Sequence, residues 1–193
     1  MRDLGKYKEK IEAIRERAAS IHENVNQKYD RIHPYSFHLC SVADCVMEHM
    51  EDCLPEDDVL PVVFGAYFHD SIEDARLSYN DVRRIALEYM DERQSLVAAE
   101  IVYALTNDKG RTRAERAGEK YYEGIRTTPY ASFVKMADRH ANFSYSVGNG
   151  QRMAQVYRDE MPHFMESVVV KGTEPGSWYH VPASLLEAID RLV

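Results

Sequence analysis

The stretch YFHDSIED, residues 67–74, brings one imidazole and three carboxylates together: His69, Asp70, Glu73 and Asp74. The apolar run VVFGAYF, residues 62–68, leads directly into His69. Ionisable groups at the end of a buried segment are costly unless they are paired or bind an ion. Imidazole and carboxylate donors together suit a divalent ion such as manganese, iron or zinc. This composition therefore indicates a metal site.

The spacing within this stretch limits how it can bind an ion. Neighbouring residues on a helix point about 100° apart, so His69 and Asp70 converge on one ion only near a helix end or with bent rotamers. Glu73 and Asp74 each follow one of them by four residues, which places a row of carboxylates beside a row of ligands on one helix. Two ligands are too few for a stable site, so the others must come from elsewhere in the chain.

Two residues stand out as further ligands. His38 lies in HPYSFHLCSVA at the start of a predicted helix, and Asp138 is an acid within the otherwise apolar run SFVKMADRHANF. Each has a plainer interpretation when it is taken singly. A buried histidine often makes only a core hydrogen bond, and a mid-helix aspartate often forms a salt bridge to a neighbour such as Arg139 or to another helix.

Four motifs in order carry a resemblance to a known family. PYSFH, FHDSIED and VKMADRHAN resemble the PYxxH, HDxxED and VKLADRxxN of HD-domain metal-dependent phosphohydrolases, in the RelA/SpoT-type alarmone hydrolase branch. ALTNDKG resembles a loop of its small stand-alone members. The resemblance covers about residues 22–147, with a fainter match in VVVKG and the last helix. It implies an all-α HD-type helical bundle.

The resemblance also implies roles for the residues above. Four of them would hold one divalent ion, commonly manganese: His38, His69, Asp70 and Asp138. Glu73 and Asp74 would position or deprotonate the attacking water, because a carboxylate not used by the metal can accept a proton. The implied activity is hydrolysis of a nucleotide, with guanosine 3′,5′-bis(diphosphate), ppGpp, losing its 3′-pyrophosphate as the specific expectation.

Substrate contacts are expected at five residues by the same resemblance: Lys28, Arg31, Thr106, Arg113 and Asn142. The family's RxSGxPY is replaced here by DRIHPY, which changes the loop that carries Arg31. A basic run, residues 109–120, follows Thr106. It would either border the ligand or form a solvated helix face paired with Glu115 and Glu119.

Other functions remain open from the sequence. The altered loop makes a phosphatase of another nucleotide or of a phosphorylated cofactor an alternative. A non-catalytic metal or nucleotide sensor is a second, although it would not need the water-activating acids. A two-iron HD-type oxygenase needs more histidines, and none lies between His69 and His140.

The elements that must position these residues are predicted to be helices, because apolar residues recur at three- and four-residue steps. We expect one all-α domain over residues 1–193, with the core motifs at about 22–147 and C-terminal helices over 151–193. Capping boxes are predicted at Ser78–Asp81 and Thr112–Glu115, and prolines at the first helical position at Pro61 and Pro129. Further helices are predicted over 6–26, 36–50, 95–105, 151–170 and 183–193, and a loop over 51–58.

Composition restricts the function classes further. The 193 residues carry a formal net charge of −8, which argues against general nucleic-acid binding. No apolar run reaches membrane-spanning length, and the charged N-terminus has no signal-peptide pattern. The three cysteines favour free thiols in the cytoplasm. The expected partner is a small-molecule nucleotide, and the first helix either packs on the body or contributes to a homo-oligomer.

Overall fold

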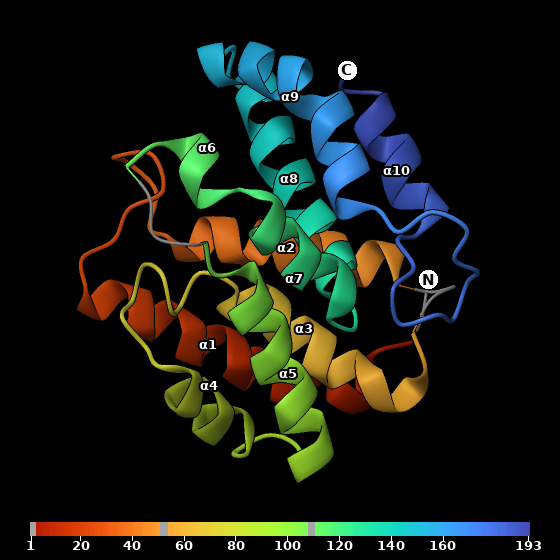
Figure 1. Ribbon diagram of the computed structural model, residues 1–193. Coiled ribbons are helices and arrows are strands. Elements are labelled where there is room, and N and C mark those ends of the chain that lie inside the picture. The colour runs from red at the N-terminus through yellow and green to blue at the C-terminus, as the bar shows by residue number, and fades with distance from the viewer. Residues whose placement is uncertain (1–2, 51–53, 108–110) are drawn as a thin grey trace.

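The computed structural model describes residues 3–50, 54–107 and 111–193, and within these ranges the regular structure is helical (Figure 1). The one ladder contact in the described ranges is an isolated bridge between Lys28 and Pro34. The helices are η1 (Gly5–Tyr7), α1 (Lys8–Asn24), α2 (Ser36–His49), η2 (Glu56–Asp58), α3 (Val59–Phe68), α4 (Tyr79–Ala86), α5 (Glu92–Leu105), α6 (Arg113–Arg116), α7 (Glu119–Thr127), α8 (Ala131–Gly148), α9 (Arg152–Val168) and α10 (Ala183–Asp190).

Helix α3 lies at the centre of the protein. All of its residues are buried, so its apolar surface must be covered on every side. Helices α1, α2, α5 and α8 provide that cover (Figure 1). The approach of α5 is close, because a Cβ added at Gly65 would lie 2.6 Å from Cγ2 of Ile101.

Helix α8 joins this centre to the C-terminal part of the chain. It packs against α2 and α3 on one side and against α9 and α10 on the other (Figure 1). Its buried face includes Phe133, Met136 and Ala137. Because α2, α8 and the end of α3 meet in the interior, side chains from three separate parts of the sequence can converge there.

Both predicted capping boxes are confirmed. Ser78 accepts a hydrogen bond from the amide of Asp81, and the Asp81 side chain accepts one from the amide of Ser78. At the start of α6, the amide of Glu115 donates to Oγ1 of Thr112 (3.2 Å) and the amide of Thr112 donates to Oε2 of Glu115 (3.4 Å). These local sequence signals therefore fix two helix starts.

Both predicted proline starts are wrong by two residues. Helix α3 begins at Val59, so Pro61 is its third residue, where a missing N–H is tolerated because the first-turn N–H groups have no helical partner. Helix α8 begins at Ala131 rather than at Pro129. Tyr130 has a left-handed backbone (φ 63°), and its amide donates to the carbonyl of Trp178 (2.6 Å).

The chain also departs from helix where the sequence predicted a continuous row of ligands. Helix α3 ends at Phe68, and residues 69–75 form turns. The amide of Ser71 reaches only three residues back, to the carbonyl of Phe68 (2.9 Å), which tightens the chain out of the α-helical pattern. In the predicted loop 51–58, residues Glu56–Asp58 form η2, and residues 51–53 lie outside the described ranges.

Two further sequence features have a plain structural outcome. Cys40 and Cys45 are free thiols, and Cys53 lies outside the described residues. Among the described helices, none has both the length and the apolar character that crossing a membrane requires.

Candidate metal centre

His69 and Asp70 follow the last residue of α3, a helix-end position that allows them to converge. The Nδ1 atom of His69 lies 2.8 Å from the carbonyl oxygen of Ala66. A carbonyl only accepts hydrogen bonds, so Nδ1 carries a proton, and Nε2 faces the interior as the nitrogen that can bind an ion. The helix end therefore fixes both the ring orientation and the tautomer of His69.

His38 from α2 and Asp138 from α8 meet His69 at this point. The Oδ1 atom of Asp138 lies 3.3 Å from Nε2 of His38 and 3.8 Å from Nε2 of His69. One ligand atom from each of the three residues lies within 4.8 Å of the others, and all three residues are buried. Their chemistry and spacing suit a divalent ion placed between them.

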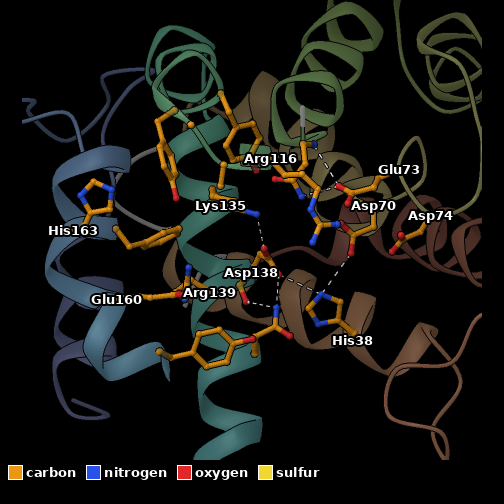
Figure 2. Close-up of a pocket in the computed structure, with 18 of the residues that line it drawn as sticks. His38, Asp70, Glu73, Asp74, Arg116, Lys135, Asp138, Arg139, Glu160 and His163 are labelled. Carbon is orange, nitrogen blue, oxygen red and sulfur yellow. Dashed lines mark hydrogen bonds and ion pairs between the residues drawn. The ribbon is translucent and has the colours of Figure 1, made fainter. Parts of the chain in front are cut away.

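Asp70 stands beside this group. Its Oδ2 atom is 2.9 Å from Nε2 of His69. The same atom is 3.8 Å from Nε2 of His38 (Figure 2). The same oxygen accepts a hydrogen bond from the hydroxyl of Tyr35 (2.5 Å). All four predicted metal ligands are therefore close together, although they come from three segments of the chain.

One imidazole nitrogen supports the fit to a metal. Nε2 of His69 is buried, faces the other ligand atoms and has no hydrogen-bond partner. The contact from Nε2 of His69 to Asp70 is short enough for an ion pair, yet its direction does not make a hydrogen bond. A buried polar atom without a partner is costly, and a metal ion at Nε2 would satisfy it.

Asp138 is held from two sides. Its Oδ2 atom pairs with Nζ of Lys135 (2.9 Å), and its Oδ1 atom accepts a hydrogen bond from Nδ2 of Asn142 (2.7 Å). Burial alone would raise the pKa of the Asp138 carboxyl, but the Lys135 ammonium and the His38 ring hold it well below its usual range. The carboxylate is therefore ionised and oriented with Oδ1 toward the histidines.

The same charges act on the pair at the end of α3. Burial alone would lower the pKa of His69, but the carboxylates of Asp70 and Asp138 raise it to about 9. Burial would raise the pKa of Asp70, whereas His69 lowers it below its usual range. The carboxylates thus favour a positive charge at this point. A bound divalent cation would provide that charge.

The group opens into a cavity of about 850 Å³, within the size range of ligand pockets. Glu73 and Asp74 also line it, and Figure 2 shows them near Asp70, across the cavity from Glu160 and His163 of α9. Oε2 of Glu73 accepts a hydrogen bond from Nδ2 of Asn107 (2.8 Å). Both acids thus border the cavity beside the ligand group.

Three of the predicted substrate contacts lie elsewhere. Lys28 and Arg31 are exposed and are not among the residues that line the cavity. Thr106 does not line the cavity either. Its hydroxyl donates a hydrogen bond to the carbonyl of Val102 in α5 (3.0 Å). Asn142 does line the cavity, and the side chain of Arg113 lies outside the described part of the structure.

Several residues of the site were not predicted from the sequence. Lys135 lies three residues before Asp138 in the motif VKMADRHAN, and this helical spacing could have revealed the pair. Tyr35 belongs to the motif PYSFH, although nothing in the motif indicates its contact with Asp70. Gln27, which donates a hydrogen bond to Asp74, and Tyr29, which donates one to Asn142, have no sequence signal, because these contacts depend on the folded chain.

Comparisons with known proteins support the fold. No family model matches the chain, and no curated protein sequence matches it. A solved structure of a metazoan ortholog of SpoT, which hydrolyses ppGpp and plays a role in starvation responses, is similar to it with a TM-score of 0.64. The similarity covers 95% of this chain and 93% of that chain at 22% sequence identity. The chain therefore has the all-α, HD-type helical fold that its motifs predict.

Proposed function

We propose that the protein is a metal-dependent phosphohydrolase that acts on a nucleotide. The observation that carries the proposal is the buried group of His38, His69 and Asp138, of which His38 and Asp138 line a cavity of about 850 Å³. Its ligand atoms face one another, and Nε2 of His69 is buried without a hydrogen-bond partner. A buried group of this kind, with no other structural use for that nitrogen, is best explained by a bound ion.

The metal would be manganese or another divalent ion with a similar preference for ligands, such as iron or zinc. Imidazole and carboxylate donors suit such ions. When it is bound, a divalent ion supplies Lewis-acid activation of water and of a phosphoryl group. The four ligands would be His38, His69, Asp70 and Asp138.

The chain's own residues provide the remaining chemistry. Glu73 lies at the cavity wall outside the ligand group, so its carboxylate is available to orient a water and accept its proton. Asp74 lies beside it and would share this role. Lys135 and Arg116 also line the cavity and would offset the negative charge of a phosphorylated substrate. Figure 2 shows Arg116 on the same side of the cavity as Asp70 and Glu73.

The specific substrate that we propose is ppGpp, with removal of its 3′-pyrophosphate. The sequence motifs resemble those of alarmone hydrolases, and the similar solved structure is of a protein that hydrolyses ppGpp. The similarity extends over nearly all of both chains, so the proposal applies to the whole fold rather than to one motif. The activity would be cytoplasmic, where free thiols such as Cys40 and Cys45 remain reduced.

One observation favours a second candidate, a phosphatase of another nucleotide or of a phosphorylated cofactor. The two basic residues expected to contact the nucleotide, Lys28 and Arg31, are exposed and do not line the cavity. Arg31 has a left-handed backbone (φ 77°) in the altered loop. The same metal centre would then serve a substrate that this loop does not select.

The test is release of phosphate and pyrophosphate from a nucleotide panel that includes ppGpp, with Mn²⁺ and with EDTA. Pyrophosphate release from ppGpp alone, dependent on Mn²⁺, is the expected result. Release from other nucleotides but not from ppGpp would support the second candidate. No metal-dependent release from any substrate would contradict both candidates.

A further inference from the structure

Side chains from the connection between α1 and α2, residues 25–35, reach the acids of the metal centre. Nε2 of Gln27 donates a hydrogen bond to Oδ2 of Asp74 (2.6 Å). The hydroxyl of Tyr35 donates one to Oδ2 of Asp70 (2.5 Å). The acceptors lie 47 and 35 residues further along the chain, so both contacts form only in the folded protein. Each holds a carboxylate that borders the cavity.

A third side chain acts on Asp138 through a neighbour. The hydroxyl of Tyr29 donates to Oδ1 of Asn142 (2.9 Å), and Nδ2 of Asn142 donates to Oδ1 of Asp138 (2.7 Å). Because the tyrosine hydroxyl occupies the amide oxygen, the amide nitrogen must face the carboxylate. The Tyr29 ring also stacks on His38, with ring centroids 5.0 Å apart and 4° between the planes.

His22 supports the connection from behind. Its Nδ1 atom lies 2.6 Å from Oε1 of Gln27, and its ring stacks on Tyr35 at 4.7 Å. The residue is 1% exposed, so it has no freedom to turn toward water. The Asp74 carboxylate requires a donor and so takes the amide nitrogen of Gln27, which leaves the amide oxygen for Nδ1–H of His22. Both ends of the Gln27 amide are therefore fixed.

The basic side chains of the same connection point elsewhere. Lys28 and Arg31 are exposed and do not line the cavity, whereas Tyr29 and Tyr35 do. The inward polar groups of Gln27, Tyr29 and Tyr35 thus already hydrogen-bond to Asp74, Asn142 and Asp70. They are therefore not available to bind a substrate.

We propose that Gln27, Tyr29 and Tyr35 are positioning residues, through which the α1–α2 connection orients the carboxylates of the metal centre. The proposal rests on the proposed function, since it assigns these residues to the same site. Partners that hydrogen-bond to a metal ligand fix its orientation, and their loss typically lowers metal affinity about tenfold to a hundredfold. The connection therefore sets metal affinity and turnover.

The first test measures metal affinity and does not depend on activity. Tyr35→Phe and Tyr29→Phe should each raise the Mn²⁺ dissociation constant of the full chain, by about tenfold to a hundredfold for Tyr35→Phe. The measurement is calorimetric titration, with thermal melting to establish that each variant is folded. The matched control is Tyr79→Phe, which removes a tyrosine–carboxylate hydrogen bond to Glu100 (2.6 Å) away from the site. Dissociation constants within twofold of wild type in both folded variants would overturn the proposal.

The second test separates positioning from substrate binding. Gln27→Leu should lower kcat about tenfold to a hundredfold through a misplaced Asp74, with KM and the Mn²⁺ dissociation constant unchanged. Gln155→Leu is the matched control, because it removes a glutamine–carboxylate hydrogen bond to Asp159 (2.9 Å) on the surface. A raised KM with unchanged kcat would assign Gln27 to substrate binding and overturn its positioning role.

The two tests distinguish this proposal from the proposed function. A wild-type chain that binds Mn²⁺ but hydrolyses no nucleotide contradicts the function, and the tyrosine variants still decide the positioning role. A wild-type chain that hydrolyses a nucleotide, with metal affinity unmoved in both tyrosine variants, contradicts the positioning role alone. A chain that binds no Mn²⁺ contradicts both.

Discussion

Asp138 contacts both a lysine beside the site and the two histidines of the proposed metal centre. One carboxylate oxygen pairs with the Lys135 ammonium, and the other faces the nitrogens of His38 and His69. Asp138 is therefore both the counter-ion of a largely buried lysine and a proposed metal ligand. Substituting Asp138 tests both roles, because the free energy of unfolding reports on the pair with Lys135 and the metal content reports on the proposed ligand.

Asp138→Ala should abolish metal binding, since one ligand of four is lost and the ion is then loosely held. The measurement is manganese content by mass spectrometry after reloading and desalting. The variant also leaves Lys135 without its carboxylate, so Asp138→Asn is made in parallel to preserve the packing. Asp159→Ala on the surface is the control. Wild-type manganese content in either Asp138 variant would show that the ligand assignment is wrong.

Glu73→Gln should keep the metal and lower turnover by about a hundredfold or more, which is the scale of a general base. Glutamine still offers an oxygen to the Asn107 side chain, so the local hydrogen bond can persist while the basic oxygen is lost. Steady-state kinetics with metal content measured on the same sample checks this. Glu100→Gln is the matched control, and unchanged turnover in Glu73→Gln would remove Glu73 from the mechanism.

At the scale of elements, the contact between α3 and α5 determines where the ligand pair is placed. Gly65 allows the two helices to approach, because a side chain there would meet Ile101. Isoleucine is branched at Cβ and has little freedom to move aside. The position of α3 is therefore set by a backbone contact one turn before His69.

Gly65→Ala should destabilise the protein by about 1–3 kcal/mol through overpacking. Urea unfolding followed by circular dichroism gives the free energy of unfolding. Gly124→Ala in α7 is the matched control, because its added Cβ would meet nothing within 4 Å. The control should gain about 0.5–1 kcal/mol from helix propensity. Equal effects at the two glycines would contradict the close approach of α3 and α5.

The elements also show what the sequence can predict. The capping boxes at Ser78 and Thr112 were predicted correctly because their partners lie three residues away. The start of α8 was not, because Tyr130 is held by the carbonyl of Trp178 and by the carboxylate of Asp58, both distant in sequence. The four residues proposed as metal ligands were chosen through their motifs, and the fold brings them close together. The contacts of Gln27, Tyr29 and Tyr35 were not predicted, because they form only when the α1–α2 connection folds over the site.

For the whole molecule, metal binding should appear as stability. An ion that binds only the folded chain adds about 2.7 kcal/mol to the free energy of unfolding at about 100 times its dissociation constant. Urea unfolding with Mn²⁺ and with EDTA measures this difference. Asp138→Ala should show no difference between the two conditions. Equal wild-type stability in both would mean that the folded chain does not bind the ion preferentially.

The burial of α3 along its whole length has a consequence for how this protein tolerates change. A helix of this size is about 15 Å long, so a tilt of about 4° about its first residue moves its far end by about 1 Å. That far end carries His69 and Asp70. A substitution in the core that barely alters stability can therefore still displace both of these proposed ligands together. Variation at apolar positions of α3 and α5 would then be limited by the geometry of the distant site before it is limited by folding.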